Sequence, residues 1–170
     1  MYEPREDSEL MLDAIRELDL RGERALDMGT GSGILAGELA GRFEDVVAVD
    51  IRQEAVDRVD ALGMKNVEAV VSDLFENVNG GGGAGKFDLI VFNPPYLPEP
   101  YEDDVELHCG DGGVIARFLE GAKKHLKPGG RVLLLLSSIT PKIPLDGWKC
   151  RKVGSRKISF EELFVLELMT

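Results

Sequence analysis

The sequence predicts an α/β fold of the doubly wound type, a seven-stranded and mostly parallel sheet with helices on both faces. Short apolar runs alternate with segments of helical periodicity along the whole chain. Three of these runs end in an acidic residue, at spacings that leave room for a helix between them. The 170 residues, of which 44% are hydrophobic, suffice for one core, so we expect residues 1–170 to form a single domain.

Five apolar runs predict the parallel strands, and four segments with an apolar face predict the helices. The strands are expected near residues 25–27, 46–50, 67–71, 89–92 and 131–136. The helices are expected near residues 8–18, 34–42, 53–62 and 114–126. Residues 127–130, Lys-Pro-Gly-Gly, are a helix-stop signal directly before the fifth strand and support these boundaries.

The last two strands are expected at residues 148–153 and 160–168, joined by a hairpin at residues 154–157. By analogy with other folds of this type, the seventh strand should run antiparallel to the rest. Between the fifth strand and Trp148 only residues 139–147 remain, and they contain two prolines. The helix that is usual at this place should therefore be short or missing.

The first strand runs into a glycine-rich turn, residues 27–33 (Asp-Met-Gly-Thr-Gly-Ser-Gly), which opens a helix. A dinucleotide site needs G-x-G-x-x-G, but the third glycine comes one residue early here. S-adenosylmethionine fits better, because its methionine part carries a carboxylate and an ammonium instead of a pyrophosphate. Gly29, Gly31 and Gly33 would allow close backbone approach, and Asp27 would supply an acid. A glycine-rich turn without a ligand is the alternative.

Two further strands end near acids that suit the same cofactor. Asp50 ends the second strand, seventeen residues after Gly33, and is placed to accept both ribose hydroxyls. Asp73 follows the third strand and is placed to accept the adenine amino group. Either acid alone is more often a solvated residue at a strand end, but three strands with this feature favour a ligand site.

Asn93-Pro94-Pro95-Tyr96 directly follows the fourth strand and indicates chemistry on a planar nitrogen. An amide or exocyclic amino nitrogen is a poor nucleophile, because its lone pair is delocalised. The Asn93 side-chain oxygen and the Pro94 carbonyl can each accept one N–H of such a group, which favours a more tetrahedral nitrogen. The prolines restrict the backbone that holds these acceptors, and Tyr96 can stack on the flat group. A proline-rich turn is the alternative.

These motifs resemble those of the class I S-adenosylmethionine-dependent methyltransferases, which have a Rossmann-like fold. Within that class they resemble the HemK-type glutamine methyltransferases that modify peptide-chain release factors. Residues 2–8, Tyr-Glu-Pro-Arg-Glu-Asp-Ser, are similar to the opening Y-x-P-x-E-D-S/T motif of the short archaeal and eukaryotic branch. The match continues through the glycine turn, Asp50, Ser72-Asp73-Leu74, the NPPY motif, Gly110-Asp111-Gly112-Gly113 and residues 160–166. NPPY alone is shared with DNA and RNA adenine methyltransferases.

The resemblance implies a role for individual residues. The cofactor would be S-adenosylmethionine, which leaves as S-adenosylhomocysteine. The resemblance implies that Ser8, Asp27 and Gly29 hold its methionine end and that Asp50 holds its ribose. Asp73 and Leu74 would frame its adenine. Asn93 would bind the substrate amide next to the methyl group. Residue chemistry offers a second, compatible role for Ser8 as the N-cap of the first helix. No metal is required, because the sulfonium is already an activated electrophile.

Charge separates two substrate classes. The net charge is −11, and residues 1–110 hold 25 of the 31 acidic side chains but only 9 of the 20 basic ones. An acidic surface repels phosphate, whereas duplex-DNA binding depends on counterion release. We therefore expect the Gly-Gly-Gln glutamine of a release factor as the substrate, with adenine in DNA or RNA as the alternative. The chain has one basic cluster, which consists of Lys149, Arg151, Lys152, Arg156 and Lys157. This cluster either binds an acidic patch or RNA, or its side chains are simply solvated.

The third strand should lie at the sheet edge, and residues 67–71 are apolar for an uncovered edge. In the resembling branch a small zinc-binding activator protein pairs with this part of the enzyme, which implies a heterodimer here. Residues 79–85 are glycine-rich and are expected to form a flexible loop. Cys109 and Cys150 match no metal-ligand spacing, so we expect free thiols. No run reaches the length of a membrane span, and we expect a soluble cytoplasmic protein.

Overall fold

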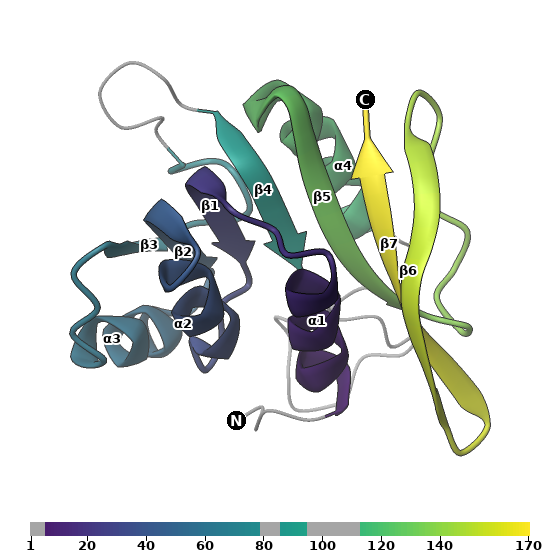
Figure 1. The fold of residues 1–170 in the computed structure, drawn as a ribbon, viewed down its shortest axis with the longest axis horizontal. Coiled ribbons are helices and arrows are strands. Elements are labelled where there is room, and N and C mark those ends of the chain that lie inside the picture. Colours follow the sequence, from purple (N-terminus) through teal and green to yellow (C-terminus); the bar gives the residue numbers. More distant parts are fainter. Residues whose placement is uncertain (1–5, 79–85, 95–112) are drawn as a thin grey trace.

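The computed structural model describes residues 6–78, 86–94 and 113–170, which form a seven-stranded sheet and four helices (Figure 1). The predicted motif residues 2–5, 95–96 and 110–112, Cys109 and the glycine-rich residues 79–85 lie outside these ranges. The strands are β1 (Gly22–Met28), β2 (Phe43–Asp50), β3 (Val67–Val71), β4 (Phe87–Phe92), β5 (Leu126–Ser137), β6 (Lys149–Ile158) and β7 (Glu161–Met169). The helices are α1 (Glu6–Glu17), α2 (Ile34–Ala40), α3 (Gln53–Ala61) and α4 (Gly113–His125).

The strands are arranged in the order β3-β2-β1-β4-β5-β7-β6. Strands β1 to β5 pair in parallel with one another, and β7 is antiparallel to both β5 and β6. The order reverses between β1 and β4, and such a switch point is where open α/β sheets bind ligands. The predicted fold class, the antiparallel last strand and the edge position of β3 are therefore confirmed.

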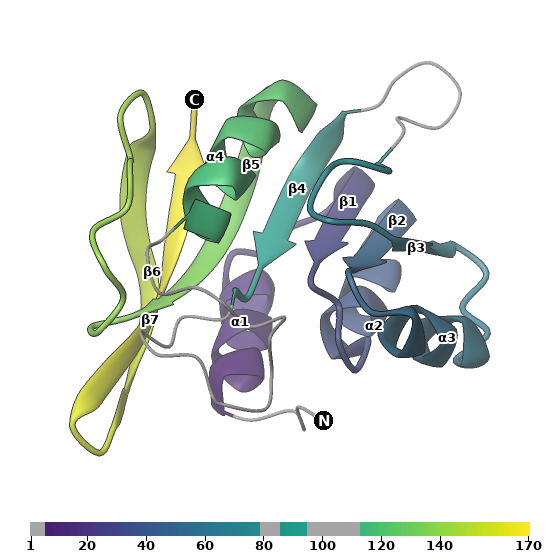
Figure 2. The same ribbon diagram turned by 180° about the vertical axis from the view of Figure 1, so that it is seen from behind.

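Helices cover both faces of the sheet (Figures 1 and 2). On one face, Met11 of α1 and Leu39 of α2 share a core with Leu133 of β5. On the other face, Phe118 of α4 packs in a second core with Leu134. Leu133 and Leu134 face opposite cores because successive side chains of a strand alternate. None of the described helices is long and apolar enough to cross a membrane.

The segment between β5 and β6 contains no helix, as its length and prolines predicted. Its apolar side chains Ile143, Leu145 and Trp148 pack against the core on the α4 face instead. Lys123 of α4 holds the segment, because its Nζ donates to the Asp146 carbonyl at 2.8 Å and lies 5.3 Å from the centre of the Trp148 ring. Among the described residues, α4, this extended segment and the residues that follow β3 thus cover this face of the sheet.

The hairpin between the last two strands lies further along the chain than predicted. Pairing continues to Ile158 opposite Glu161, and the turn consists of Ser159 and Phe160, with a positive φ of 52° at Ser159. Gly154, which suggested the turn, marks a shift in register within β6. The prediction of a hairpin at residues 154–157 is wrong, because glycine inside a strand also marks a bulge.

A buried acid ties the three C-terminal strands together. Glu167 of β7 is 1% exposed. Its Oε1 accepts from Arg131 of β5 at 2.9 Å, and its Oε2 accepts from Arg151 of β6 at 3.0 Å. Both guanidinium groups reach solvent, so the buried charge is satisfied without burying its partners.

We expect Glu167→Ala to lower the free energy of unfolding by about 1–3 kcal/mol, because the charge-assisted hydrogen bonds from Arg131 on β5 and Arg151 on β6 are lost at once. Urea denaturation of the two proteins measures this difference. Glu44→Ala, the same change at an exposed position of β2, is the control and should stay within about 0.5 kcal/mol of the parent. Equal effects of the two substitutions would contradict the role given to Glu167.

Candidate functional site

The first four strands of the chain end at nearly the same level, so their carboxyl ends form one edge of the sheet, which is distinct from the outer strand β3. One row of paired residues crosses five parallel strands: Val70, Val49, Met28, Phe92 and Leu134. The residues that follow this row in β1, β2 and β4 therefore lie at the same end of the sheet, and all three were predicted for the site: Gly29, Asp50 and Asn93. Parallel pairing thus brings together side chains that are far apart in the sequence.

The glycine-rich turn after β1 needs glycine for two different reasons. Gly29, Gly31 and Gly33 all have positive φ, at 69°, 53° and 81°, a region that L-residues with side chains rarely adopt. At Gly33 a Cβ would also lie 3.0 Å from Val59 of α3. At Gly31 the surroundings are open, and the atom nearest to such a Cβ is the Gly29 carbonyl oxygen, 3.9 Å away. The turn therefore exposes bare backbone at Gly31.

Asp27 lies beneath this turn and is fully buried. Thr30 donates its hydroxyl to Oδ2 at 2.7 Å, whereas Oδ1 has no hydrogen-bond partner among the described residues. Burial raises the pKa of Asp27 to about 7, although the Thr30 hydroxyl and the nearby Ala36 N–H favour the charged form. The site thus contains a buried carboxyl group with one unused acceptor, which is costly unless a ligand or water satisfies it.

Asp50 supports the same turn from β2. Its Oδ2 accepts the Gly31 N–H at 3.0 Å, and its Oδ1 accepts the Arg52 N–H at 3.0 Å. The Arg52 Nε lies 3.4 Å from Oδ1. The carboxylate therefore fixes the turn and the start of α3, and its Oδ2, with one donor, keeps acceptor capacity for a ligand.

The Asp73–Leu74 turn after β3 is held against α4. Asp73 Oδ2 accepts from Arg117 Nη2 at 2.9 Å, a contact that the sequence did not indicate. Leu74 has a positive φ of 50°, and its carbonyl accepts the Ser72 hydroxyl at 2.9 Å. Phe75 completes the attachment to α4. The turn is therefore positioned by tertiary contacts as well as by its own hydrogen bonds.

Phe75 also explains a glycine of α4. A Cβ at Gly121 would lie 2.3 Å from the Phe75 ring, so no larger residue fits there without movement. The ring stacks on His125, with centres 4.5 Å apart, and on Phe118, with centres 5.7 Å apart. These contacts place the turn after β3 next to the core of the α4 face.

Asn93 is half-buried and is held by α1, which packs on the face of the sheet opposite to α4. Its Nδ2 donates to Asp7 Oδ2 at 3.2 Å, and Asp7 is 2% exposed. The backbone N–H of Ser8 donates to Asp7 Oδ1 at 2.7 Å. Pro94 is buried directly after Asn93, while the predicted site residues Pro95 and Tyr96 lie outside the described ranges. The sequence did not identify Asp7 as a site residue, although it belongs to the Glu-Asp-Ser run before the first helix.

Ser8 does not cap α1. The helix already includes Glu6 and Asp7, so Ser8 is the third residue of its first described turn. The prediction of an N-cap at Ser8 is wrong. The acidic residues Glu6, Asp7 and Glu9 suit the positive end of the helix dipole and allow the helix to begin earlier. Ser8 is buried beside Asp7, at the same edge as Asn93.

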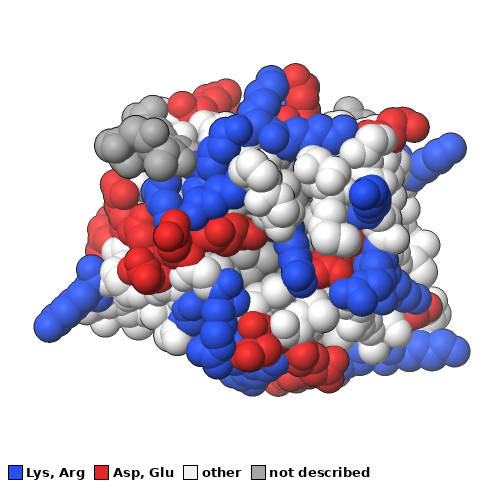
Figure 3. Space-filling view, turned by 45° about the horizontal axis from the view of Figure 1, so that its top comes forward, with Lys and Arg blue, Asp and Glu red and all other residues white. Residues whose placement is uncertain are grey.

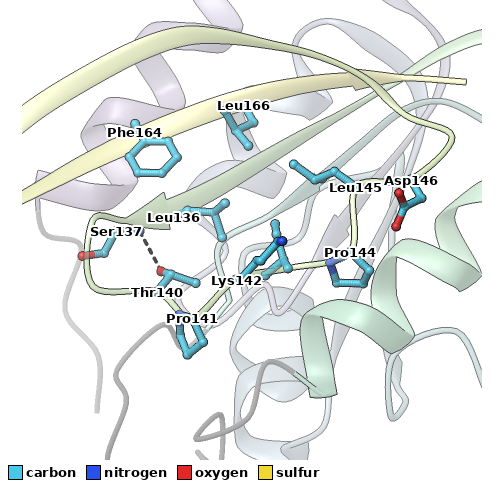
Figure 4. Close-up of a pocket in the computed structure, with 11 residues that line it drawn as sticks. Leu136, Ser137, Thr140, Pro141, Lys142, Pro144, Leu145, Asp146, Phe164 and Leu166 are labelled. Carbon is cyan, nitrogen blue, oxygen red and sulfur yellow. Dashed lines mark hydrogen bonds between the residues drawn. The ribbon is translucent and has the colours of Figure 1, made fainter.

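A groove of about 860 Å³ opens where β5 ends, on the α4 face of the sheet (Figure 4). Leu136, Phe164 and Leu166 form its floor, and residues 140–146 form its wall. Leu136 lies two residues beyond Leu134, the neighbour of Phe92 in the sheet. The groove is mostly apolar, so it suits binding, whereas the acceptors that could act on a nitrogen lie at Asn93.

Comparison with known proteins identifies the family. The family described as methyltransferase small domain matches residues 5–145. A protein of Methanocaldococcus jannaschii that is named as a protein N5-glutamine methyltransferase is 35% identical, over 98% of this chain and 90% of that protein. The release factor glutamine methyltransferase of Koribacter versatilis is 39% identical over 77% of this chain. The chain spans about half, 53%, of that bacterial relative.

A solved structure is similar over nearly the whole chain. It is the Mtq2–Trm112 complex of E. cuniculi, described as responsible for the methylation of the translation termination factor eRF1. The matched chain is 27% identical, with a TM-score of 0.76, and the match covers 99% of this chain and 98% of that one. The likeness thus extends from the glycine-rich turn to the C-terminal strands.

The buried carboxyl of Asp27 predicts a pH dependence of stability. Because its folded pKa of about 7 lies above the ordinary value of 3.8, the stability due to this group is fully present below about pH 4 and is lost as pH rises to about 7. We expect Asp27→Asn to gain stability relative to the parent by about 2–3 kcal/mol when the pH rises from 5 to 8. Urea denaturation without ligand at both pH values measures the difference.

Asp60→Asn, at an exposed position of α3, is the control for this experiment and should show no such trend. A difference between Asp27→Asn and the parent that does not change with pH would contradict the raised pKa.

Proposed function

The chain belongs to the methyltransferase small domain family, and from that premise we propose that it methylates the side-chain amide nitrogen of a glutamine in a protein. The methyl donor is S-adenosylmethionine, and the glutamine lies in the Gly-Gly-Gln sequence of a peptide-chain release factor. The observation that carries the proposal is the pairing of β1 with β4, which brings the glycine-rich turn after β1 next to Asn93 after β4 at the carboxyl ends of these strands. The turn suits the cofactor, and Asn93 suits a planar nitrogen.

The residues at this edge fit the cofactor. Bare backbone at Gly31 leaves room for close approach, and the unused Oδ1 of Asp27 is an acceptor suited to an ammonium group. Asp50 retains acceptor capacity for ribose hydroxyls, and Asp73 and Leu74 form the turn that would frame the adenine. When bound, S-adenosylmethionine supplies a methyl group on a sulfonium, which departs as a thioether without help from an acid. We propose no metal for this reaction.

Asn93 and Pro94 would activate the substrate. Their two carbonyl oxygens would each accept one N–H of the glutamine amide, which draws the nitrogen lone pair out of conjugation and holds it toward the methyl group. The nitrogen lone pair then forms the new N–C bond, and the amide loses one proton to water. Most of the rate would come from proximity and from these two acceptors, without a covalent enzyme intermediate.

The comparisons support a protein substrate. The M. jannaschii relative, which matches over nearly its full length, is named as a glutamine methyltransferase, and the E. cuniculi complex is described as acting on eRF1. We propose that the apolar groove at the end of β5 receives substrate residues that flank the glutamine. Small glycines beside the target would let the amide reach Asn93.

The charged surface also favours protein over nucleic acid. Three members of the basic cluster on β6 are neutralised by ion pairs: Arg151 with Glu167, Lys152 with Glu162, and Arg156 with Glu9 and Asp13. Lysines and arginines are interspersed with acidic side chains on the face shown in Figure 3. Such a surface offers little of the unbroken positive charge that phosphate binding needs. Adenine in DNA or RNA therefore stays the alternative substrate, ranked after the glutamine of a protein.

We propose a small partner protein at the free edge of the sheet. Strand β3 pairs only with β2 among the described strands, and Val67, Ala69, Val70 and Val71 are half-buried. An edge of this kind is a template for added strands. The E. cuniculi chain was solved as a complex with Trm112, which supports a heterodimer. A zinc-binding partner, activity that depends on it and a cytoplasmic location are parts of the same proposal.

The proposed function predicts transfer of label from methyl-labelled S-adenosylmethionine to a release factor. The chain, co-purified with its small partner, should methylate the cognate factor, and peptide mass spectrometry should map the label to the Gly-Gly-Gln glutamine. Unmodified DNA and RNA are assayed alongside. Label found only in adenine would overturn the substrate and leave the cofactor site unchanged.

Two substitutions should separate chemistry from cofactor binding. Asn93→Ala should lower kcat roughly 10²- to 10⁴-fold while the Kd for S-adenosylhomocysteine stays within about threefold, because one acceptor for the substrate amide is lost. Asp50→Ala should mainly raise the Kd, since the glycine-rich turn loses its support. Kinetics and calorimetry measure the two quantities. Unchanged turnover in Asn93→Ala would show that the NPPY motif has another role.

A further inference from the structure

We propose that Asp7 is a positioning residue, which fixes the orientation of the Asn93 side-chain amide. The proposal rests on the proposed function, because it concerns the same site, but the contact that carries it is independent of the substrate. Asp7 lies in the first turn of α1 and is 2% exposed. Its side chain therefore has a fixed place at the edge of the sheet.

The two oxygens of Asp7 accept from different elements. Oδ1 accepts the backbone N–H of Ser8 at 2.7 Å, which ties the carboxylate to its own helix. Oδ2 accepts from Asn93 Nδ2 at 3.2 Å, across 86 positions of the sequence. The carboxylate thus joins the start of α1 to the residue that follows β4.

This contact decides which end of the amide faces the substrate. An ionised carboxylate accepts hydrogen bonds and cannot donate them, so the NH2 end of Asn93 must face Asp7. In the reversed orientation the carbonyl oxygen of Asn93 would face another negatively charged oxygen, and its NH2 would lose an acceptor. Asn93 Oδ1 therefore points away from Asp7, where it is available to accept from the glutamine amide.

The charge of Asp7 adds a second effect. A hydrogen bond from Nδ2 to a carboxylate polarises the amide and increases the negative charge on Oδ1. A more negative Oδ1 is a stronger acceptor for the substrate N–H as the nitrogen becomes tetrahedral. Asp7 would thus act through Asn93, without touching the substrate.

Asp7→Asn is the substitution that tests this role, because it keeps the shape of the side chain. An asparagine at this position can donate or accept, so both orientations of the Asn93 amide become possible and the negative charge is lost. With the release factor as substrate and saturating S-adenosylmethionine, we expect kcat to fall roughly 10- to 100-fold. The KM and the Kd for S-adenosylhomocysteine should stay within about threefold.

Glu9→Gln is the matched control. Glu9 is an exposed acid in the same turn of α1 and pairs with Arg156 at 3.0 Å, so its change removes one charge from the helix start without touching Asn93. We expect its kcat to stay within about twofold of the parent. A comparable loss in Glu9→Gln would assign the effect to the helix terminus and would overturn the proposal.

A spectroscopic measurement tests the geometry without any substrate. Nuclear magnetic resonance of the 15N-labelled chain, with the Asn93 side-chain amide assigned by comparison with Asn93→Ala, should show one Nδ2 proton shifted downfield and slow to exchange. Asp7→Asn should reduce both properties. An amide spectrum unchanged by Asp7→Asn, or wild-type turnover in that variant, would each overturn the proposal. A parent chain that methylates no glutamine would overturn the proposed function alone.

Discussion

The parallel register of β1, β2, β3 and β4 is the constraint on which the rest of the structure depends. Because Met28, Val49, Val70 and Phe92 lie in one row, the residues that follow these strands meet at one edge. The reversal of strand order between β1 and β4 directs helices α2 and α4 to opposite faces of the sheet. A slip of one residue in any of these strands would turn its side chains to the wrong face.

Two buried acids at this edge have different surroundings and therefore different uses. Asp27 has one hydroxyl donor on Oδ2 and none on Oδ1 among the described residues, and burial raises its pKa. Asp7 has a donor on each oxygen, and one of these donors is the amide of Asn93. The first acid suits a cationic part of a ligand, whereas the second suits the orientation of a neighbouring side chain. Environment, and not residue type, separates the two.

Local patterns predicted the features that depend on neighbours in the sequence. The glycine spacing, the acid at the end of β2 and the Asn-Pro pair after β4 were all identified correctly as strand-end features, and the structure places them at one edge. The missing helix before β6 followed from two prolines in a short segment. These features are fixed within a few residues of the chain, so the sequence around them is sufficient.

Features that depend on tertiary packing could not be predicted in the same way. The contact of Asp7 with Asn93 and that of Arg117 with Asp73 join elements that only the folded sheet brings together. Gly154 has the composition of a turn, but pairing with β7 continues past it, and the turn lies at Ser159 and Phe160. Helix α1 already includes Glu6 and Asp7, so the capping preference of Ser8 does not set its start, and the three acids of its first turn suit the helix dipole.

A crystal structure of the chain with its partner, S-adenosylhomocysteine and a peptide containing Gly-Gly-Gln would test the central claim most directly. We expect the glutamine amide nitrogen within hydrogen-bond distance of both Asn93 Oδ1 and the Pro94 carbonyl oxygen, with Asn93 Nδ2 still bound to Asp7. A glutamine held elsewhere, or an Asn93 amide that turns its NH2 toward the peptide, would contradict the proposed site.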